Sequence, residues 1–452
     1  MVRFSFHDED GSLIPNVCGS NDLSDPIDAI EIKGPLDVQQ NRYKVLTTML
    51  NSSSERFNRI QVSEMSEESP EFLAFLVLVG NKTRNLELHN CQLNDNATAC
   101  LMAALLQWDG IWELEIESSH DMTASQLRLL CEGIASSRSL ETLKLDLESI
   151  RDDNREAGEA LISGLRRNRS LTSLNIVASQ FFEEDSFLPN LMKAAVLDAK
   201  VEELVIHVFR DGLNQELNLD VLEDVLCCEE CDLSELRLYG VNLRAESESA
   251  SNIETVSQNE SVTDLVIHAG NFDYHVLMKT IRLFNSLQTL ELSGTEITSL
   301  EVLDHLLLDE SSTLEHLDVR ENLVGAEEMK RFVSKLDKTK HLQSVKIGKN
   351  PWEDSGYNSV KEALVDSIQK STSLERVDID CADLYLALNR GGRRAFMPES
   401  SESVPISLWP RILQRASKEK YYNFSDGAGE PSITDLRVDV LFWMLKRMAP
   451  QL

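Results

Sequence analysis

A spacing of apolar residues that recurs along the chain constrains the fold more than any other feature of the sequence. Its clearest copy lies in the segment 311–336, where the first, fourth, sixth, ninth and eleventh places of a unit are Leu314, Leu317, Val319, Asn322 and Val324. This spacing predicts a short strand followed by a turn. Apolar residues then follow at spacings of three and four, which places one apolar stripe on a helix. A single unit cannot bury its own apolar face, so it needs copies on both sides.

Copies of the first, fourth and sixth places occur along almost the whole chain. They number about thirteen, at roughly 29 residues each. The sets are Ile27/Ile30/Ile32, Phe57/Ile60/Val62, Thr83/Leu86/Leu88, Ile111/Leu114/Ile116, Leu140/Leu143/Leu145, Leu171/Leu174/Ile176, Val201/Leu204/Ile206, Leu233/Leu236/Leu238, Val262/Leu265/Ile267, Leu287/Leu290/Leu292, Leu314/Leu317/Val319, Leu342/Val345/Ile347 and Leu374/Val377/Ile379. One set means little because leucine is common, whereas a run at nearly constant period predicts a solenoid.

The frame L-x-x-L-x-L-x-x-N/C-x-L, filled at its ninth place by Asn322 in one unit and by Cys91 in another, resembles the ribonuclease-inhibitor-like class of leucine-rich repeats. The resemblance covers about residues 27–384. It implies an α/β fold, a right-handed leucine-rich-repeat solenoid (horseshoe) with a parallel concave sheet and convex helices. Members of this class bind proteins, and some act on small GTPases or on ribonucleases. Several units depart from the frame at the ninth place, so only the fold and the mode of binding carry over; the departures are Val241, Thr295 and Ala382.

The composition of the two ends predicts how the array is bounded. An irregular acidic lead-in is expected over residues 1–26, and the repeat array over 27–388. Glycine, proline and serine in 389–405 predict a flexible loop. Two apolar-faced pieces within 406–452 predict a C-terminal helical cap over the open end of the solenoid. Alternatively, three aromatic side chains of this last segment anchor a partner, namely Trp409, Phe442 and Trp443.

Helical spacing of apolar residues also predicts where the convex helices lie. The expected ranges are 36–50, 69–80, 97–108, 123–135, 155–167, 188–197, 219–227, 273–284, 300–308 and 357–370. The segment 245–258 is nearly all polar, so we expect its helix to be the least well packed of the array.

The acidic composition limits the class of partner. The chain has 76 acidic and 44 basic residues and a net charge of -32. This charge repels nucleic-acid phosphates and suits a protein partner with a basic surface. Alternatively, the charge only keeps a large repeat surface dispersed. The first residues, MVRFSFHDEDGS, lack the apolar run of a secretory signal, and the longest apolar run, 72–79, is too short to span a bilayer. We therefore expect a cytoplasmic or nuclear protein that does not bind membranes.

The sequence contains no motif that predicts catalysis. The spacings of nucleotide-binding loops, zinc proteases and serine hydrolases are missing. We therefore expect no catalytic residue, no cofactor and no metal ligand, and a protein that is not an enzyme. The one cysteine cluster, Cys227, Cys228 and Cys231, has no second pair of ligands nearby in the sequence, which favours thiols at a helix end over a zinc site.

The strand residues that face away from the core predict a binding surface. Alternate residues of a strand face opposite sides, so the third, fifth and seventh places of each unit line the concave face. Three successive units supply an acidic row, a mixed row and an aromatic row, which are Glu203/Glu235/Asp264, Val205/Arg237/Val266 and His207/Tyr239/His268. Tyrosine and arginine are typical of binding hot spots, although some rows align by chance. The candidate partner-binding residues are Glu203, Val205, His207, Glu235, Arg237, Tyr239, Asp264 and His268.

Earlier strands carry an acidic stretch, which is either a surface that steers a basic partner or simply a solvated face. Its residues are Glu87, Glu113, Glu115, Glu117 and Asp146. Together these features predict a non-catalytic protein-binding scaffold that uses the concave face of a repeat solenoid. The alternative is a regulator, either an activator or a binder, of a small GTPase. The sequence leaves open which protein is bound and what the oligomeric state is.

Overall fold

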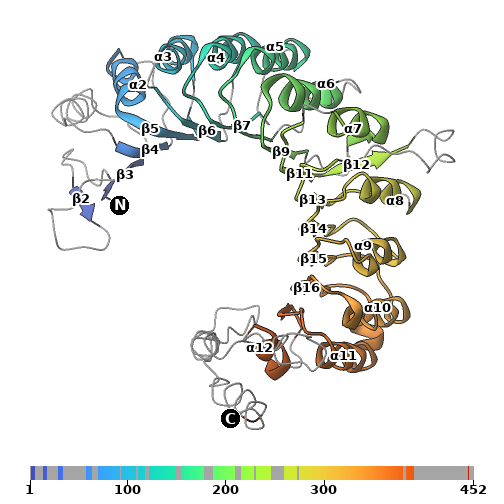
Figure 1. Cartoon of the computed structure of the whole chain (residues 1–452). Coiled ribbons are helices and arrows are strands. Elements are labelled where there is room, and N and C mark those ends of the chain that lie inside the picture. The colour runs from blue at the N-terminus through green and yellow to red at the C-terminus, as the bar shows by residue number, and fades with distance from the viewer. Residues whose placement is uncertain are drawn as a thin grey trace, which may run out of the picture. The chain divides into compact units, whose positions relative to one another are not determined.

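A computed structural model of the chain describes residues 2–5, 14–17, 29–33, 57–63, 70–91, 93–107, 110–117, 122–147, 154–177, 187–208, 215–228, 231–245, 259–271, 274–379, 383–390 and 446. The chain divides into two compact units, residues 1–247 and residues 248–452. Within each unit, strands alternate with helices along the chain, and the strands lie side by side in a sheet (Figure 1).

The sheet of the first unit is parallel except at its first strand pair. Its strands are β1 (Val2–Ser5), β2 (Ile14–Val17), β3 (Ala29–Lys33), β4 (Phe57–Ser63), β5 (Thr83–His89), β6 (Glu113–Glu117), β7 (Thr142–Asp146), β8 (Ser173–Val177), β9 (Glu203–His207) and β11 (Glu235–Tyr239). They follow the order β2-β1-β3-β4-β5-β6-β7-β8-β9-β11. Only β2 runs antiparallel to its neighbour, β1. These first two strands lie in the lead-in that the sequence predicts to be irregular.

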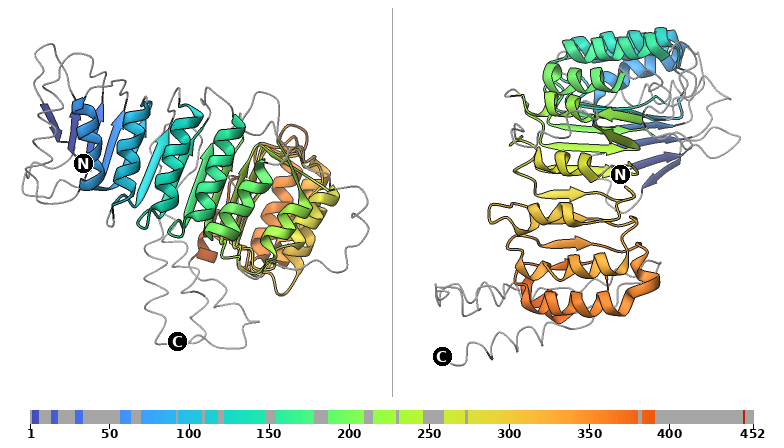
Figure 2. Two further views of the ribbon diagram at one scale, coloured as in Figure 1. Left: turned by 90° about the horizontal axis from the view of Figure 1, so that it is seen from above. Right: turned by 90° about the vertical axis from the view of Figure 1, so that its right-hand side faces the viewer.

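The helices of the first unit form a row on one side of this sheet (Figure 2). They are α2 (Pro70–Lys82), α3 (Asp95–Leu105), α4 (Ala124–Ser136), α5 (Asn154–Arg167), α6 (Phe187–Lys193) and α7 (Leu219–Leu226), with a π-helical turn over Ala194–Ala199 after α6. Helix α4 begins in a capping box, because the Thr123 hydroxyl accepts from the backbone of Gln126 and the Gln126 side chain accepts from the backbone of Thr123. This reciprocal pair satisfies donors that a helix start leaves open.

The second unit repeats the same alternation with shorter strands. These are β13 (Asp264–His268), β14 (Thr289–Glu291), β15 (His316–Asp318), β16 (Ser344–Lys346) and β17 (Arg376–Val377), and each pairs in parallel with the next. The helices are α8 (Tyr274–Arg282), α9 (Asp304–Leu308), α10 (Ala326–Val333), α11 (Trp352–Lys370) and α12 (Asp383–Arg390). Two 3₁₀ turns, Glu301–Leu303 and Leu336–Lys338, flank α9 and α10.

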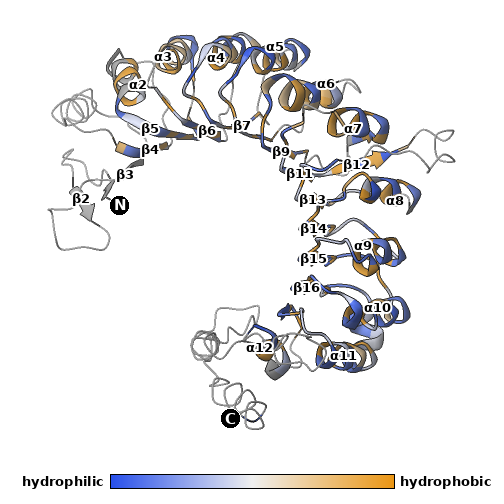
Figure 3. Ribbon diagram, viewed as in Figure 1, coloured by the Kyte–Doolittle hydropathy of each residue, from blue (hydrophilic) through white to orange (hydrophobic). Residues whose placement is uncertain are grey.

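The first, fourth and sixth places of the repeats form the core between strands and helices. From Phe57 to Leu374, each residue at these places is buried, whereas Val377 and Ile379 in the last repeat are half-buried. The side chains of the first set, from Ile27 to Ile32, lie outside the described residues. The helices carry hydrophobic colour on one side and hydrophilic colour on the other (Figure 3). Repeated strand–helix modules that share one core in each unit confirm the predicted leucine-rich-repeat fold.

A left-handed residue turns the chain at the eighth place of six repeats. The backbone φ there lies between 52° and 72°, at Asn90, Gly240, Ala269, Gly294, Glu321 and Lys349. The next place carries the side chain that ties one repeat to the one before it. Asn322, Asn350 and Cys91 each donate to the sixth-place carbonyl of the preceding repeat, at 2.6, 3.0 and 3.5 Å. The ninth place is therefore fixed by hydrogen bonding between repeats.

At Val241, where the sequence departs from the repeat frame, a second and smaller sheet begins in the first unit. Gly240 has a φ of 72°, and strand β12 (Val241–Arg244) follows it directly. It pairs in parallel with β10 (Gln215–Asn218), and Leu217 and Leu243 of these strands are buried. The repeat frame does not predict this sheet, because it replaces the usual turn with another strand.

The predicted helices from residue 69 to residue 370 are present where the structure describes them, with bounds that differ by a few residues. The largest shift is in α11, which begins at Trp352 and contains an irregular residue, Gly356. A Cβ atom at residue 356 would lie 2.3 Å from Cβ of Ala326, so the missing side chain lets α10 and α11 approach. The helix predicted over 36–50, most of the polar segment 245–258, residues 391–405 of the predicted loop and the predicted cap apart from residue 446 lie outside the described residues. The first two residues of the predicted loop, Asn389 and Arg390, instead end helix α12.

Candidate protein-binding surface

The third, fifth and seventh places of the strands form the face of each sheet opposite to the helices, which we call the strand face. The burial of β7, β8 and β11 alternates, with Leu or Ile pointing to the core and half-buried residues between them. In the first unit the register pairs Glu203 with Glu235, Val205 with Arg237 and His207 with Tyr239. The sequence therefore predicted these three rows correctly for two neighbouring strands.

The rings of His207 and Tyr239 stack on the strand face of the first unit. Their centroids are 4.2 Å apart and their planes are 5° from parallel. Both side chains are half-buried, and Val205 beside them is buried. Burial lowers the pKa of His207 below its ordinary value, which favours the neutral imidazole at neutral pH. The stacked pair is thus an uncharged aromatic platform.

Arg237 lies between this platform and the acidic row. Its guanidinium bonds the carboxylate of Glu235 on the same strand. Burial acts to lower the pKa of Arg237, but its interactions with Glu235 and Tyr239 outweigh burial and raise the pKa, so the side chain keeps its charge. On the neighbouring strand, Glu203 accepts a hydrogen bond of 2.8 Å from Ser173. Cationic, anionic and aromatic groups therefore lie together on the adjacent strands β9 and β11.

The third strand of the predicted patch, β13, belongs to the second unit. The Thr263 hydroxyl donates to Asp264 at 2.6 Å. Nδ1 of His268 lies 2.7 Å from the hydroxyl of Ser293, which donates in turn to Glu291 at 3.0 Å. In a serine nucleophile relay the histidine stands between the serine and the carboxylate. Here the serine stands in the middle and is buried, so the order of the three groups differs from that of such a relay.

A charge network on the strand face of the second unit was missed by sequence reasoning. The guanidinium of Arg320 binds Asp318 through two nitrogens, at 3.0 and 2.8 Å, and Lys346 approaches the same carboxylate at 3.1 Å. Burial acts to raise the pKa of Asp318, but these hydrogen bonds outweigh burial and hold its pKa below the ordinary value. The signal in the sequence is Asp318 at the end of β15 with Arg320 two residues later in the turn, and Lys346 at the place that pairs with Asp318 on the next strand.

The acidic stretch of the first unit is not a uniformly solvated face. Glu87 is buried and pairs with Arg59 at 2.5 Å. Lys144 lies 3.2 Å from Glu115 and 3.6 Å from Glu113. Two cations are thus set into the acidic rows of β4 to β7. The interpretation of this stretch as a solvated face needs correction at Glu87, because a buried carboxylate requires a charged partner.

Two further places were considered as binding sites, namely the cysteine cluster and a small surface pocket. Cys227 caps the end of α7, as expected for thiols at a helix end, and no disulfide joins any two of the described cysteines.

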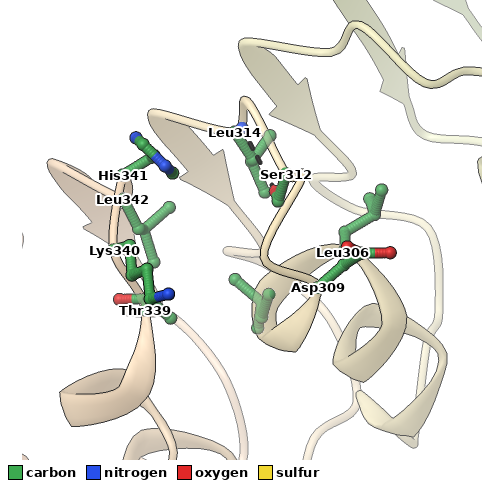
Figure 4. Close-up of a pocket in the computed structure, with 9 residues that line it drawn as sticks. Leu306, Asp309, Ser312, Leu314, Thr339, Lys340, His341 and Leu342 are labelled. Carbon is green, nitrogen blue, oxygen red and sulfur yellow. Dashed lines mark hydrogen bonds between the residues drawn. The ribbon is translucent and has the colours of Figure 1, made fainter.

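A small hollow in the second unit lies where α9 ends and where the chain enters β15 and β16 (Figure 4). It is lined by core leucines and by polar residues that include Asp309, Ser312, Thr339, Lys340 and His341. Lys340 in this hollow already pairs with Glu310, so we assign no ligand to the hollow.

Comparisons with known proteins do not assign a function to the chain. Neither a protein-family model nor a curated protein matches the chain. Among solved structures, 64 chains match. One of them is the leucine-rich repeat-containing protein LegL7 from Legionella pneumophila, with 12% identity, coverage of 76% of this chain and 89% of that chain, and a TM-score of 0.34. The fold assignment rests on the repeat frame and the strand register. Among the described helices, none has the length and apolar character that crossing a bilayer requires.

Proposed function

We propose that this leucine-rich-repeat protein is a non-catalytic scaffold that binds another protein on its strand face. The binding surface is centred on the first unit, on His207, Arg237 and Tyr239, and is flanked by Glu203 and Glu235. Asp264 and His268, on the strand face of the second unit, are proposed as contact residues of that unit by itself. The observation that carries the proposal is the stacked pair of His207 and Tyr239.

The stack supports binding because it is ordered before a partner arrives. A flat ring pair on adjacent strands has few rotamers left to lose, so less conformational entropy opposes association. Tyrosine and arginine are also the residue types that dominate binding energy at protein interfaces. Because the pKa of His207 is lowered, a partner can cover the ring at neutral pH without desolvating a charge.

The charges around the stack favour a partner with a basic surface. Glu203 and Glu235 lie at paired positions on β9 and β11, and Arg237 offsets one of these charges. The whole chain carries a net charge of -32, which speeds encounters with basic proteins at low ionic strength. A cytoplasmic or nuclear location is part of the proposal, since reduced thiols persist in those compartments and the described cysteines are not joined in disulfides.

The decisive experiment is a pull-down from native lysate with quantitative mass spectrometry. The test variant combines Arg237→Ala and Tyr239→Ala. The control variant combines Arg155→Ala and Tyr357→Ala, which remove the same residue types from exposed positions on helices α5 and α11. We expect a captured protein to be lost by the test variant and retained by the control. The affinity of that protein should then be measured with purified components, because each hot-spot side chain is worth about 2 kcal/mol or more.

The outcome also separates the two functional classes. If the test variant captures every partner that the natural chain captures, the proposed surface is wrong. If the partner is a small GTPase and the chain accelerates its GTP hydrolysis, the regulator replaces the simple scaffold. Equal loss in both variants, together with altered circular dichroism, would show unfolding, and single substitutions at Arg237 and Tyr239 would then replace the double change.

A further inference from the structure

The strand face of the first unit brings one imidazole and two carboxylates together away from the proposed protein-binding surface. His89 closes β5, and Glu115 and Glu117 lie on β6, its parallel neighbour (Figure 1). The register pairs His89 with Glu117 directly. One nitrogen of the imidazole and one oxygen of each carboxylate all lie within 4.8 Å of one another. One imidazole nitrogen and two carboxylate oxygens at such separation are a ligand set that divalent metal ions use.

We propose that His89, Glu115 and Glu117 bind a divalent transition-metal ion, with Zn²⁺ as the reference ion. Imidazole nitrogen favours zinc and its neighbours over calcium and magnesium, and carboxylates complete a three-ligand site. Nδ1 of His89 and a carboxylate oxygen of Glu117 already share a hydrogen bond. A metal ion between them takes the place of that proton, and the neutral imidazole then carries its one proton on the other ring nitrogen.

A buried carboxylate on the far side of the imidazole orients the ring for this role. Nε2 of His89 lies 3.5 Å from Glu87, which is buried and is held by Arg59 at 2.5 Å. Metal-binding histidines commonly direct their second nitrogen to a carboxylate, which fixes the tautomer and makes the ligand more basic. With the metal bound, Nε2 carries the proton toward Glu87, and Nδ1 faces the ion in place of its hydrogen bond to Glu117. Glu87 is therefore a positioning residue and not a ligand.

The charge around the site also suits a divalent cation. Four carboxylates lie in the two strands, Glu87, Glu113, Glu115 and Glu117, and the cations paired with them are Arg59 and Lys144. With a neutral imidazole, this group has a formal charge of two negative units. The side chain of Glu117 is 55% exposed, so an ion can enter from solvent. Three protein ligands also leave a coordination position open to water.

Lys144 opposes the ion and supplies a sharp test. Its ammonium group lies 3.2 Å from Glu115, a proposed ligand, and 3.6 Å from Glu113. When Glu115 turns toward the metal, the ammonium group must shift to Glu113. Removing this cation with Lys144→Ala should therefore tighten metal binding. Removal of a residue that only supported the fold would not tighten it.

The experiment measures Zn²⁺ and Co²⁺ binding to the reduced full-length chain by competition with a chromophoric chelator. The expected result is one site whose affinity falls by about tenfold or more in His89→Gln and in Glu117→Gln, and by a smaller factor in Glu87→Gln. His207→Gln, on the same strand face, should bind the metal as the natural chain does. Circular dichroism checks that each variant is folded. No partner protein is present, so the result is independent of the proposed function.

A second set of measurements tests whether the metal binds to the cysteine cluster instead. In Cys227→Ser/Cys228→Ser/Cys231→Ser the histidine–carboxylate site should remain, and bound Co²⁺ should lack the near-ultraviolet band of thiolate ligation. The proposal is overturned if Zn²⁺ does not bind the natural chain, or if His89→Gln and Glu117→Gln bind it unchanged. It is equally overturned if Co²⁺ bound to the natural chain shows a thiolate band and both the band and metal binding disappear in the triple serine variant.

Discussion

The side-chain amide of Asn322 donates a hydrogen bond of 2.6 Å to the backbone carbonyl of Leu292, one repeat earlier. The same amide nitrogen also reaches the carbonyl of Val319, while its oxygen accepts from the backbone of Thr295 and Ile297. Asn322 is buried, so water cannot replace these partners. One side chain thus satisfies backbone groups in two repeats and fixes the spacing between them.

We expect Asn322→Ala to lower the free energy of unfolding by about 2–4 kcal/mol, because several buried backbone groups lose their partner. Urea unfolding followed by circular dichroism measures the change. Asn285→Ala, at an exposed position, should change the unfolding free energy by less than about 0.5 kcal/mol. Similar losses in the two variants would contradict the role assigned to the ninth place.

Ala269 offers a test of the left-handed eighth place. Its φ of 56° is unfavourable for a residue with a Cβ atom, by about 1–2 kcal/mol. Glycine removes this strain, but it also gives the unfolded chain more conformational freedom, which destabilises the fold by about 0.4–1 kcal/mol. We therefore expect Ala269→Gly to stabilise the protein by up to about 1 kcal/mol in urea unfolding.

The matched control is Ala363→Gly, inside helix α11. There the same substitution should destabilise by about 1 kcal/mol, because glycine is a poor helix former. Changes of opposite sign in the unfolding free energy of the two variants would support the left-handed backbone conformation of Ala269. A loss of stability at both would refute it.

Gly164 in α5 allows close packing against α4. A Cβ atom at this position would lie 3.0 Å from the carbonyl oxygen and 3.1 Å from Cβ of Cys131. Helix propensity alone predicts that Gly164→Ala is stabilising. Because backbone atoms block the added methyl group, we expect instead a loss of about 1–3 kcal/mol by thermal or urea unfolding.

Gly325, before α10, provides the comparison for Gly164, because a Cβ atom added there would have no neighbouring atom within 4 Å. Gly325→Ala should change the unfolding free energy by about 0.5 kcal/mol or less. A stabilised Gly164→Ala variant would mean that α4 and α5 separate more easily than their packing implies.

The pKa of Asp318 predicts how its contribution depends on pH. Its folded-state pKa lies below the ordinary value of 3.8, because the bonds from Arg320 and Lys346 outweigh burial. The ionised group therefore stabilises the fold above the unfolded pKa, and this contribution is lost as the pH falls through the folded pKa. We expect Asp318→Asn to cost about 1–3 kcal/mol near pH 7.

Urea unfolding of both proteins from about pH 7 down to about pH 3 tests this sign. The difference between natural chain and variant should stay constant above about pH 5 and shrink below about pH 4. A difference that grows on acidification would show that the pKa of Asp318 is raised in the folded state.

The candidate surface was predictable only as far as strand periodicity reaches. Alternation along the strand and the constant repeat length placed His207 opposite Tyr239, and the parallel register confirms that pairing. The face-to-face stacking of their rings depends on side-chain rotamers, which periodicity does not determine. Their role in binding stays a prediction. Glu87 shows the same limit, because its burial follows from Arg59 on the neighbouring strand and not from its own place in the repeat.

The sequence by itself determined the fold class, since apolar residues at fixed places can be buried only when successive units stack. It also determined the outward rows, because a strand alternates its faces with a period of two residues. Only the tertiary structure decided that His89 meets Glu115 and Glu117, and that Val241 starts a second sheet with β10. Those contacts join residues of different repeats, and their distances depend on rotamers and local turns that a repeat frame leaves open.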